Sequence, residues 1–302
     1  MTYHEENIQL NAGIETIYGT VTLPEIYTKV TVVLIIAGSG PTNRDGNSTQ
    51  GLLTDSYKMI AYELAQNGIA SVRYDKRGIG ESSKAMKNEK DLALNDYIDD
   101  AVNWVQMLHN DKRFSKIAIL GHSEGSLIGM IAVDKVKVDA FISVAGMGYS
   151  FYDTLKRQLA AQANDVYDEC IPIMNELKKG NRVSDINKDY YSLFRPSVQP
   201  YIISLFKYDP AIEIKKLTIP VLIIQGNTDL QVNVADATIL NNSNPNAVLK
   251  IINGMNHTLK DAPIEQEKNL KTYTNTKLPL SSMFKESLIN FMKDTFKLYK
   301  TK

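Results

Sequence analysis

The strongest chemical signal in the sequence is a serine between two glycines, in the pentapeptide Gly121-His-Ser-Glu-Gly125. It follows the apolar run Ile117–Leu120 and immediately precedes Ser126–Val133, the rest of a helical pattern that begins at Ser123. Flanking glycines allow the sharp, strained turn that exposes a serine hydroxyl at the end of a strand. The other interpretation is a glycine-rich turn whose serine only caps a helix. The position between a strand and a helix favours the first, so we expect Ser123 to be a nucleophile.

A serine hydroxyl is a weak nucleophile, and it needs a general base and a carboxylate that orients the base. Asp229 follows the buried run Val221–Ile224 in a polar turn. This places the Asp229 carboxylate at the carboxyl edge of the predicted sheet, where Ser123 also lies. Asp236 is a nearby competitor, but it falls inside the helical pattern Val232–Leu240. We therefore expect Asp229 to be the orienting acid.

The base is expected to be a histidine, and the sequence contains four. His257 lies in the loop after the apolar run Val248–Ile252, which returns it to the same edge of the sheet. His4 precedes the sheet, His109 ends a helix on the flank, and His122 is held in the turn beside the serine. Only His257 is placed to reach the nucleophile.

Acyl transfer also needs hydrogen-bond donors for a developing oxyanion, and these are expected to be backbone N–H groups. The first is the N–H of Glu124, directly after the nucleophile. The second is expected in the glycine-rich turn Ala37–Pro41, where the N–H of Ser39 is the first choice and that of Gly38 the competitor. The same glycines could also serve only to turn the chain.

Short Val- and Ile-rich runs alternate with helical patterns along the chain, which is typical of a mostly parallel sheet with helices on both faces. An alternating pattern over Ile14–Leu23 predicts an antiparallel strand at a sheet edge. The expected buried strands are Val30–Ile36, Ala70–Tyr74, Ile117–Leu120, Ala140–Val144, Val221–Ile224 and Val248–Ile252. The expected helices are Leu52–Gln66, Leu94–His109, Ser123–Val133, Val232–Leu240 and Ser281–Leu298.

About 75 residues between Val144 and Val221 break this rhythm, because they contain aromatic and helical patterns but no buried strand. We interpret residues 147–215 as a helical cap inserted into a single domain that spans residues 1–302. Several of its aromatic side chains are expected to be buried.

Composition excludes other classes of function. Lys and Arg balance Asp and Glu at 34 each, which gives no electrostatic case for nucleic acid or a membrane surface. The single cysteine and the scattered histidines give no metal-ligand spacing, so we expect no metal. The first residues are acidic where a signal peptide would be basic, and we expect a cytoplasmic protein. The oligomeric state stays open, a homodimer included.

Five segments together resemble a known family, the bacterial carboxylesterases of the α/β-hydrolase superfamily. The segments are Gly38-Ser-Gly-Pro41 with Arg44-Asp-Gly-Asn47, Arg73–Ser82, Gly121–Gly125, Gln225–Asp229 and Gly254–His257. The resemblance implies an eight-stranded core, a helical cap after the sixth strand, no cofactor, and hydrolysis of short- to medium-chain carboxylic esters.

The resemblance places the family's nucleophile on Ser123, its acid on Asp229, its base on His257 and its oxyanion donors on Ser39 and Glu124. The chain departs from many hydrolases in having alanine where they have histidine before Gly38. The expected partner is a small-molecule ester. A peptidase or thioesterase of the same fold stays open, because the leaving group is selected by the shape of the pocket. A hydrolase-fold protein that has lost catalysis and only binds is the alternative from another class.

Overall fold

The sheet is the frame that brings the candidate site together. The computed structural model describes residues 3–12, 15–25, 29–86, 88–160 and 164–298. It contains one eight-stranded sheet in the order β1-β2-β4-β3-β5-β6-β7-β8, in which β2 is antiparallel to both neighbours and the other pairs are parallel. The strands are β1 (Tyr3–Ala12), β2 (Glu15–Pro24), β3 (Val30–Ile36), β4 (Ala70–Tyr74), β5 (Phe114–His122), β6 (Ala140–Val144), β7 (Val221–Gly226) and β8 (Val248–Ile252).

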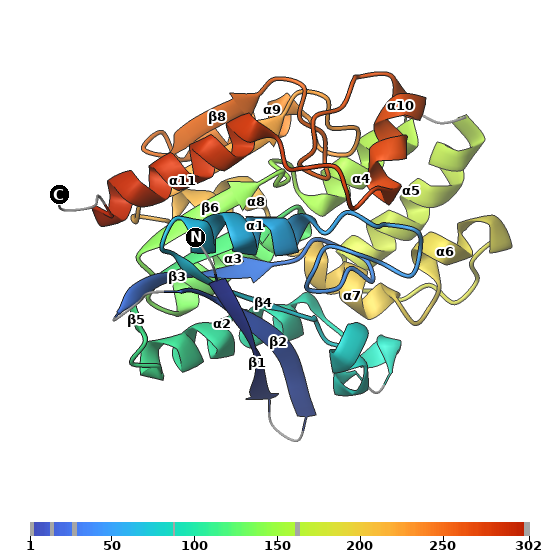
Figure 1. The fold of residues 1–302 in the computed structure, drawn as a ribbon. Helices are drawn as coiled ribbons and strands as arrows, with labels where there is room; N and C mark the ends of the chain where they lie inside the picture. Colours follow the sequence, from blue (N-terminus) through green and yellow to red (C-terminus); the bar gives the residue numbers. More distant parts are fainter. Residues whose placement is uncertain (1–2, 13–14, 26–28, 87, 161–163, 299–302) are drawn as a thin grey trace.

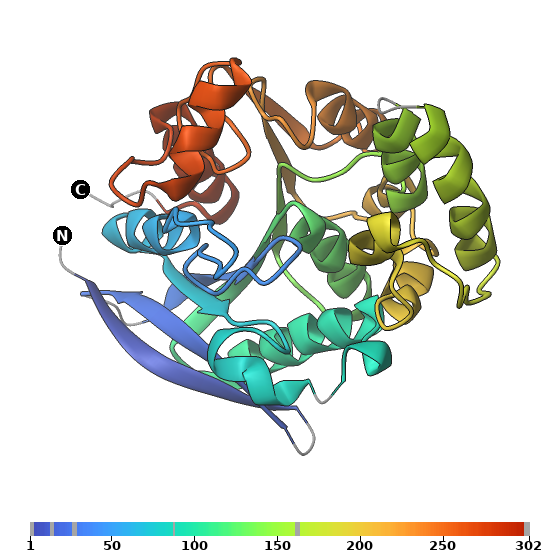
Figure 2. The same ribbon diagram turned by 90° about the vertical axis from the view of Figure 1, so that its right-hand side faces the viewer.

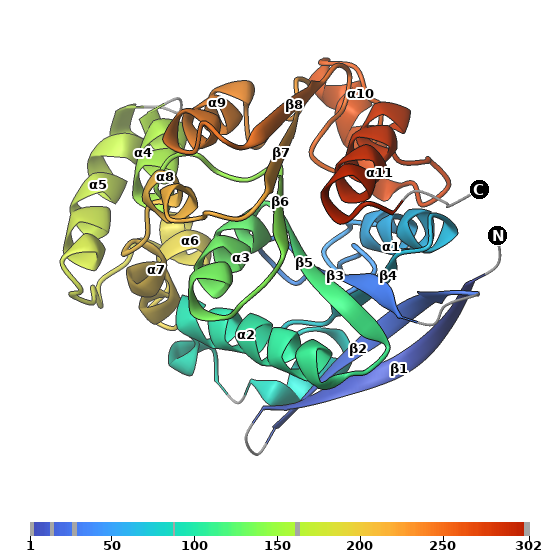
Figure 3. The ribbon, with the colours of Figure 1, turned by 90° about the vertical axis from the view of Figure 1, so that its left-hand side faces the viewer.

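Helices cover both faces of the sheet, as Figure 3 shows, and the expected fold class is confirmed. Helices α1 (Ser56–Gln66) and α11 (Ser282–Phe296) pack on one face, and α2 (Leu94–Asn110), α3 (Glu124–Lys135) and α9 (Val234–Ser243) on the other. Because neither face meets water, the central strands are apolar on both sides: β6 and β7 are buried at every position.

Two expectations about the sheet are wrong. The strand expected over Ile14–Leu23 is β2, and it is not an edge strand, because it pairs with β1 on one side and β4 on the other. Its first residue, Ile14, lies outside the described residues. The edge on that side is β1, whose polar sequence did not predict a buried strand. The strand expected to be buried over Val248–Ile252 is β8, the opposite edge of the sheet, and Val248 and Ile251 are 44% and 38% exposed. The helix expected from Leu52 also begins later, at Ser56, because Asp55 takes a left-handed conformation with φ 51°.

The segment between β6 and β7 forms helices with a small apolar core of their own. Figures 1 and 2 show these helices gathered at one end of the molecule. Buried aromatic side chains from Tyr152, Phe194 and Phe206 contribute to this core. These helices are α4 (Phe151–Ala160), α5 (Asn164–Lys178), α6 (Tyr191–Phe194) and α7 (Gln199–Leu205). The last helix of the segment, α8 (Pro210–Lys215), packs with α3 and α9 on the face of the sheet instead. The remaining helices of the chain are α10 (Gln266–Leu270) and the short 3₁₀ segments η1 (Gly80–Ala85), η2 (Glu89–Asp91), η3 (Lys188–Tyr190) and η4 (Lys271–Thr274).

Candidate active site

Ser123 occupies a strained turn between β5 and α3. Its backbone has φ 55° and ψ −123°, a conformation that L-residues rarely adopt. The glycines beside it are required by close packing: a Cβ at Gly121 would lie 2.2 Å from the carbonyl oxygen of Gly125, and one at Gly125 would lie 2.3 Å from that of Ile36. The turn therefore presses the start of α3 against β3 and lifts the serine above the sheet edge.

Asp229 and His257 form a buried pair at the same edge. Asp229 follows β7, His257 follows β8, and the Nδ1 atom of His257 lies 2.8 Å from Oδ2 of Asp229. Burial alone would raise the pKa of Asp229, but the hydrogen bond and charge of His257 and the N–H groups of Val232 and Gln231 hold that pKa below its ordinary value. An ionised Asp229 fixes the proton on Nδ1, which leaves Nε2 of His257 free to accept one.

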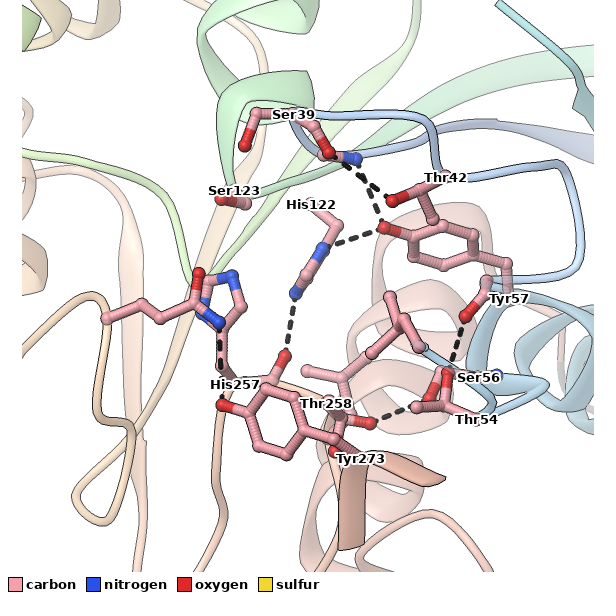
Figure 4. A pocket seen from close by; sticks show the side chains of 15 residues that line it. Ser39, Thr42, Thr54, Ser56, Tyr57, His122, Ser123, His257, Thr258 and Tyr273 are labelled. Atoms are coloured by element: carbon pink, nitrogen blue, oxygen red, sulfur yellow. Dashed lines mark hydrogen bonds between the residues drawn. The ribbon is translucent and has the colours of Figure 1, made fainter. Parts of the chain in front are cut away.

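The nucleophile and the histidine line one cavity of about 90 Å³, shown in Figure 4. Among the hydrogen bonds of the described residues there is none between Ser123 and the His257 ring. In free enzymes such a contact is often long and shortens when substrate binds. Asp236, the competing acid, lies elsewhere: it is inside α9 and accepts a hydrogen bond from the N–H of Gly148.

A chain of hydrogen bonds links the turn around Ser123 to the loop that carries His257. The Nε2 atom of His122 lies 2.9 Å from the carbonyl oxygen of His257, so Nε2 carries the proton and Nδ1 accepts one from the hydroxyl of Tyr57 at 2.8 Å. The Tyr57 hydroxyl in turn accepts from the N–H of Gly38 at 3.1 Å. Burial lowers the pKa of His122 to about 3, which keeps the ring neutral. His122 is thus a positioning group and no candidate base.

This chain bears on the choice of oxyanion donor, because the N–H of Gly38 is already committed to Tyr57. In the part of the chain that the structure describes, the N–H groups of Ser39 and Glu124 donate to no other group. Gly38 also packs against the nucleophile, since a Cβ there would lie 3.1 Å from Cβ of Ser123. Ser39 and Glu124 therefore stay the candidate donors, one on each side of Ser123.

Two reciprocal ion pairs fasten the turn after β3 to β4. Arg44 pairs with Asp75 at 2.7 Å, and Asp45 pairs with Nε of Arg73 at 2.9 Å. Arg44 and Arg73 are almost fully buried. Asn47 closes the same turn by accepting from the N–H groups at positions 54 and 55. Two of the segments that carry the family resemblance, Arg44–Asn47 and Arg73–Ser82, are thus in direct contact.

A second, larger cavity of about 570 Å³ opens on the other side of Ser39. Its walls come from the turn after β3, from η2 and α2, and from the segment between β6 and β7. Its apolar lining includes Leu193, Ile202 and Leu205, and Glu124 also contributes to it. Ser123 lines the small pocket but not the large one, whereas Ser39 lines both.

Several residues that hold the site together had no role predicted from the sequence. Gln225 donates to Oδ2 of Asp229 at 3.1 Å. Asn269 donates to the carbonyl of Thr228 and accepts from Asn256, so it links the loop of the acid to the loop of the base. Gln225 was visible only as part of a motif, and Asn269 lies in α10 with no local pattern that marks it.

The described residues contain no group of three or more His, Cys, Asp or Glu side chains that could hold a metal ion. Within the same residues, no helix has both the length and the apolar character needed to cross a membrane.

The chain is similar in sequence to several known proteins. A family model described as "Serine aminopeptidase, S33" matches residues 53–201. The chain is 28% identical over 282 residues to esterase EstD from Thermotoga maritima, an alignment that covers 88% of this chain and 64% of that relative's length. It is 24% identical to the non-heme chloroperoxidase CPO-A1 from Kitasatospora aureofaciens, over 71% of this chain and 84% of the relative.

Among solved structures, Est1E from Butyrivibrio proteoclasticus is similar to this chain, with a TM-score of 0.65, 17% sequence identity, and coverage of 96% of this chain and 99% of Est1E. At that identity the likeness concerns the fold alone. The fold of the chain is the α/β-hydrolase fold.

Proposed function

We propose that this chain, which has the α/β-hydrolase fold, is a serine carboxylesterase that works through an acyl-enzyme intermediate. The observation that carries the proposal is the buried Asp229–His257 pair, which shares a cavity with the strained Ser123. A positive φ at a non-glycine residue costs free energy, and such strain persists where the site needs it. The similarity to an esterase over most of the chain supports the same reaction class.

In the proposed reaction the Ser123 oxygen attacks the ester carbonyl while Nε2 of His257 takes the hydroxyl proton. The carbonyl oxygen becomes an oxyanion that accepts hydrogen bonds from Ser39 and Glu124. His257 then gives the proton to the leaving alcohol, and the acyl group stays on the serine. Water attacks the acyl-enzyme while His257 takes its proton, the bond between the acyl carbon and the Ser123 oxygen breaks, and His257 returns the proton to Ser123 as the carboxylic acid leaves.

The two cavities suggest how an ester is placed. His257 must reach the oxygen of the leaving alcohol, and it lines the 90 Å³ cavity but not the 570 Å³ one. Glu124 lines the large cavity, on the side of the oxyanion donors. We therefore place a small alcohol in the first cavity and a short- to medium-chain acyl group in the second, under the segment 147–215, which serves as a cap.

The test is hydrolysis of p-nitrophenyl esters of increasing acyl length by the purified chain, beside an aminoacyl-anilide and an acyl-thioester. The proposal expects the esters to have the highest kcat/KM. A preference for the anilide would make the chain a peptidase, and a preference for the thioester a thioesterase. No turnover of any of the three would favour a protein that only binds.

A further inference from the structure

A buried lysine connects the two candidate arms of the oxyanion hole. Lys76 follows β4 and is 1% exposed. Its Nζ atom donates to the carbonyl oxygen of Gly38 at 2.5 Å and lies 3.7 Å from Oε1 of Glu124. Gly38 precedes the donor Ser39, and Glu124 is itself the other donor. One ammonium group thus holds the peptide that carries one oxyanion donor and the side chain of the residue that carries the second.

We propose that Lys76 is a positioning residue for the oxyanion hole, and the proposal rests on the function proposed above. A trans peptide group directs its C=O and its N–H in opposite directions. When Lys76 fixes the carbonyl of Gly38, the N–H of Ser39 must face the other way. The N–H of Gly38 is held as well, by Tyr57, so this residue is fixed at both of its backbone groups.

The groups around Lys76 hold its ammonium group in place. Its ammonium group lies 4.8 Å from the centre of the Tyr97 ring, over the ring face. Burial lowers the pKa of Lys76, and the Glu124 carboxylate opposes that effect. A buried cation needs hydrogen-bond partners, and these are the Gly38 carbonyl and Glu124.

The relay extends into the inserted segment. The hydroxyl of Tyr201, on α7, donates to Oε1 of Glu124 at 2.6 Å. Burial and the neighbouring Glu124 raise the pKa of Tyr201, so the hydroxyl stays protonated and keeps donating. Tyr201 lines the large cavity, where the acyl group is placed. Contact with an acyl chain can therefore reach the oxyanion turn through Glu124 and Lys76, and hydrogen bonds in such chains strengthen one another.

The test compares Lys76→Met, which keeps the length of the side chain and loses its donors, with Lys116→Met, which removes a charge from an exposed surface. We expect Lys76→Met to lower kcat by about 10- to 100-fold with little change in KM, because the oxyanion is bound only in the transition state. Lys116→Met should keep both values. An unchanged kcat in Lys76→Met, or a loss confined to KM, would overturn the proposal.

A second variant tests the route through Glu124. Glu124→Gln keeps the backbone N–H and an acceptor for Tyr201 but loses the charge, and we expect a kcat roughly 3- to 10-fold below wild type with KM unchanged. In the double variant with Lys76→Met, the loss should not exceed that of Lys76→Met alone. Multiplied losses would overturn the relay. If Lys76→Met does not fold, Glu124→Gln decides, since an unchanged kcat there contradicts the proposal.

These outcomes are distinct from failure of the proposed function. If the wild-type chain hydrolyses no ester, the carboxylesterase is wrong. If the wild type is active and Lys76→Met matches it in kcat, the carboxylesterase stands and the role of Lys76 is wrong.

Discussion

The backbone of Ser123 is held in its strained conformation by neighbours that have no side chains. Such a sparsely populated conformation costs a non-glycine residue roughly 1–3 kcal/mol, which the surrounding packing must offset. Gly125 allows this packing, because it brings the start of α3 onto the backbone of Ile36. The strained backbone of Ser123 and the close contact between Gly125 and Ile36 are therefore features of the same turn.

Gly125→Ala should consequently be among the most destabilising single changes in the chain. The new Cβ would meet the carbonyl oxygen of Ile36 at 2.3 Å, a contact with backbone that no side-chain rotation relieves. We expect a loss of about 3 kcal/mol or more in the free energy of unfolding, measured by denaturant titration. Gly180→Ala is the control: it has φ 90° and open space, so it should lose only about 1 kcal/mol. Equal losses in the two variants would contradict the packing argument.

Asp229 and Asp236 can be told apart by amide substitution. Asp229→Asn keeps the shape of the side chain but favours the wrong tautomer of His257, and the analogous change in serine proteases costs on the order of 10⁴ in kcat. Asp236→Asn should stay within about tenfold of wild type, because Asp236 accepts from Gly148 and caps α9. Steady-state kinetics on one ester checks both variants, and a reversed order would transfer the acid role to Asp236.

The sequence predicted the candidate catalytic residues but not the residues that hold them in position. Ser123, Asp229 and His257 each follow a strand, and the common edge of a parallel sheet brings them near one another. Tyr57 and Asn269 gave no such signal, because their roles depend on which distant backbone groups lie within hydrogen-bond reach. That information arises only when the loops are packed.

Among the elements, the central parallel strands were predictable because burial on both faces leaves a nearly continuous apolar run, and β8 has such a run although it is a largely exposed edge strand. β1 was not, since it is an edge strand whose Glu5 and Glu6 face other partners than the core. The position of β1 follows from its pairing with β2, and no local sequence pattern predicts that pairing. The helices of the inserted segment were expected, whereas their own apolar core was not, because it joins residues far apart between Tyr152 and Phe206.

The inserted helices should set the acyl-chain preference. Each buried CH₂ contributes roughly 0.8 kcal/mol, which is about fourfold in kcat/KM until the cavity is full. We expect kcat/KM to rise from acetyl to an optimum between butyryl and octanoyl and then to fall sharply, measured with p-nitrophenyl esters. Leu193→Trp, which fills part of the 570 Å³ cavity, should shift the optimum to shorter chains.

Ile212→Trp is the control for that series, because Ile212 is exposed on α8, away from the cavity. It should leave the optimum unchanged. A profile that already falls from acetyl onward would point to a closed acyl site, and a continued rise beyond twelve carbons would point to an open groove; either would refute the cap-lined pocket.

A second buried lysine, Lys260, should make the stability of the whole molecule depend on pH. Lys260 donates to the carbonyl of Leu278 at 2.6 Å, and burial lowers its pKa from 10.5 to about 8. Between these values the unfolded chain binds more protons than the folded chain, so raising the pH favours folding. The Lys260 contribution to the free energy of unfolding therefore rises between about pH 8 and pH 10.5.

Lys260→Met removes this contribution, and the comparison isolates it from other titrating groups. We expect the stability of wild type relative to Lys260→Met to increase across that interval in denaturant titrations at several pH values. A flat difference, or a decrease, would show that Lys260 is not buried as the structure has it.

The proposed esterase activity depends on the whole molecule, because the ends of β3, β5, β7 and β8 must meet at one edge of the sheet for the serine to be activated. A fluorophosphonate probe tests it most directly, since it labels a serine only when a base activates the hydroxyl. We expect stoichiometric labelling, located on Ser123 by peptide mass spectrometry, and its loss in Ser123→Ala and His257→Ala. Labelling at another serine, or an unlabelled wild-type chain, would contradict it.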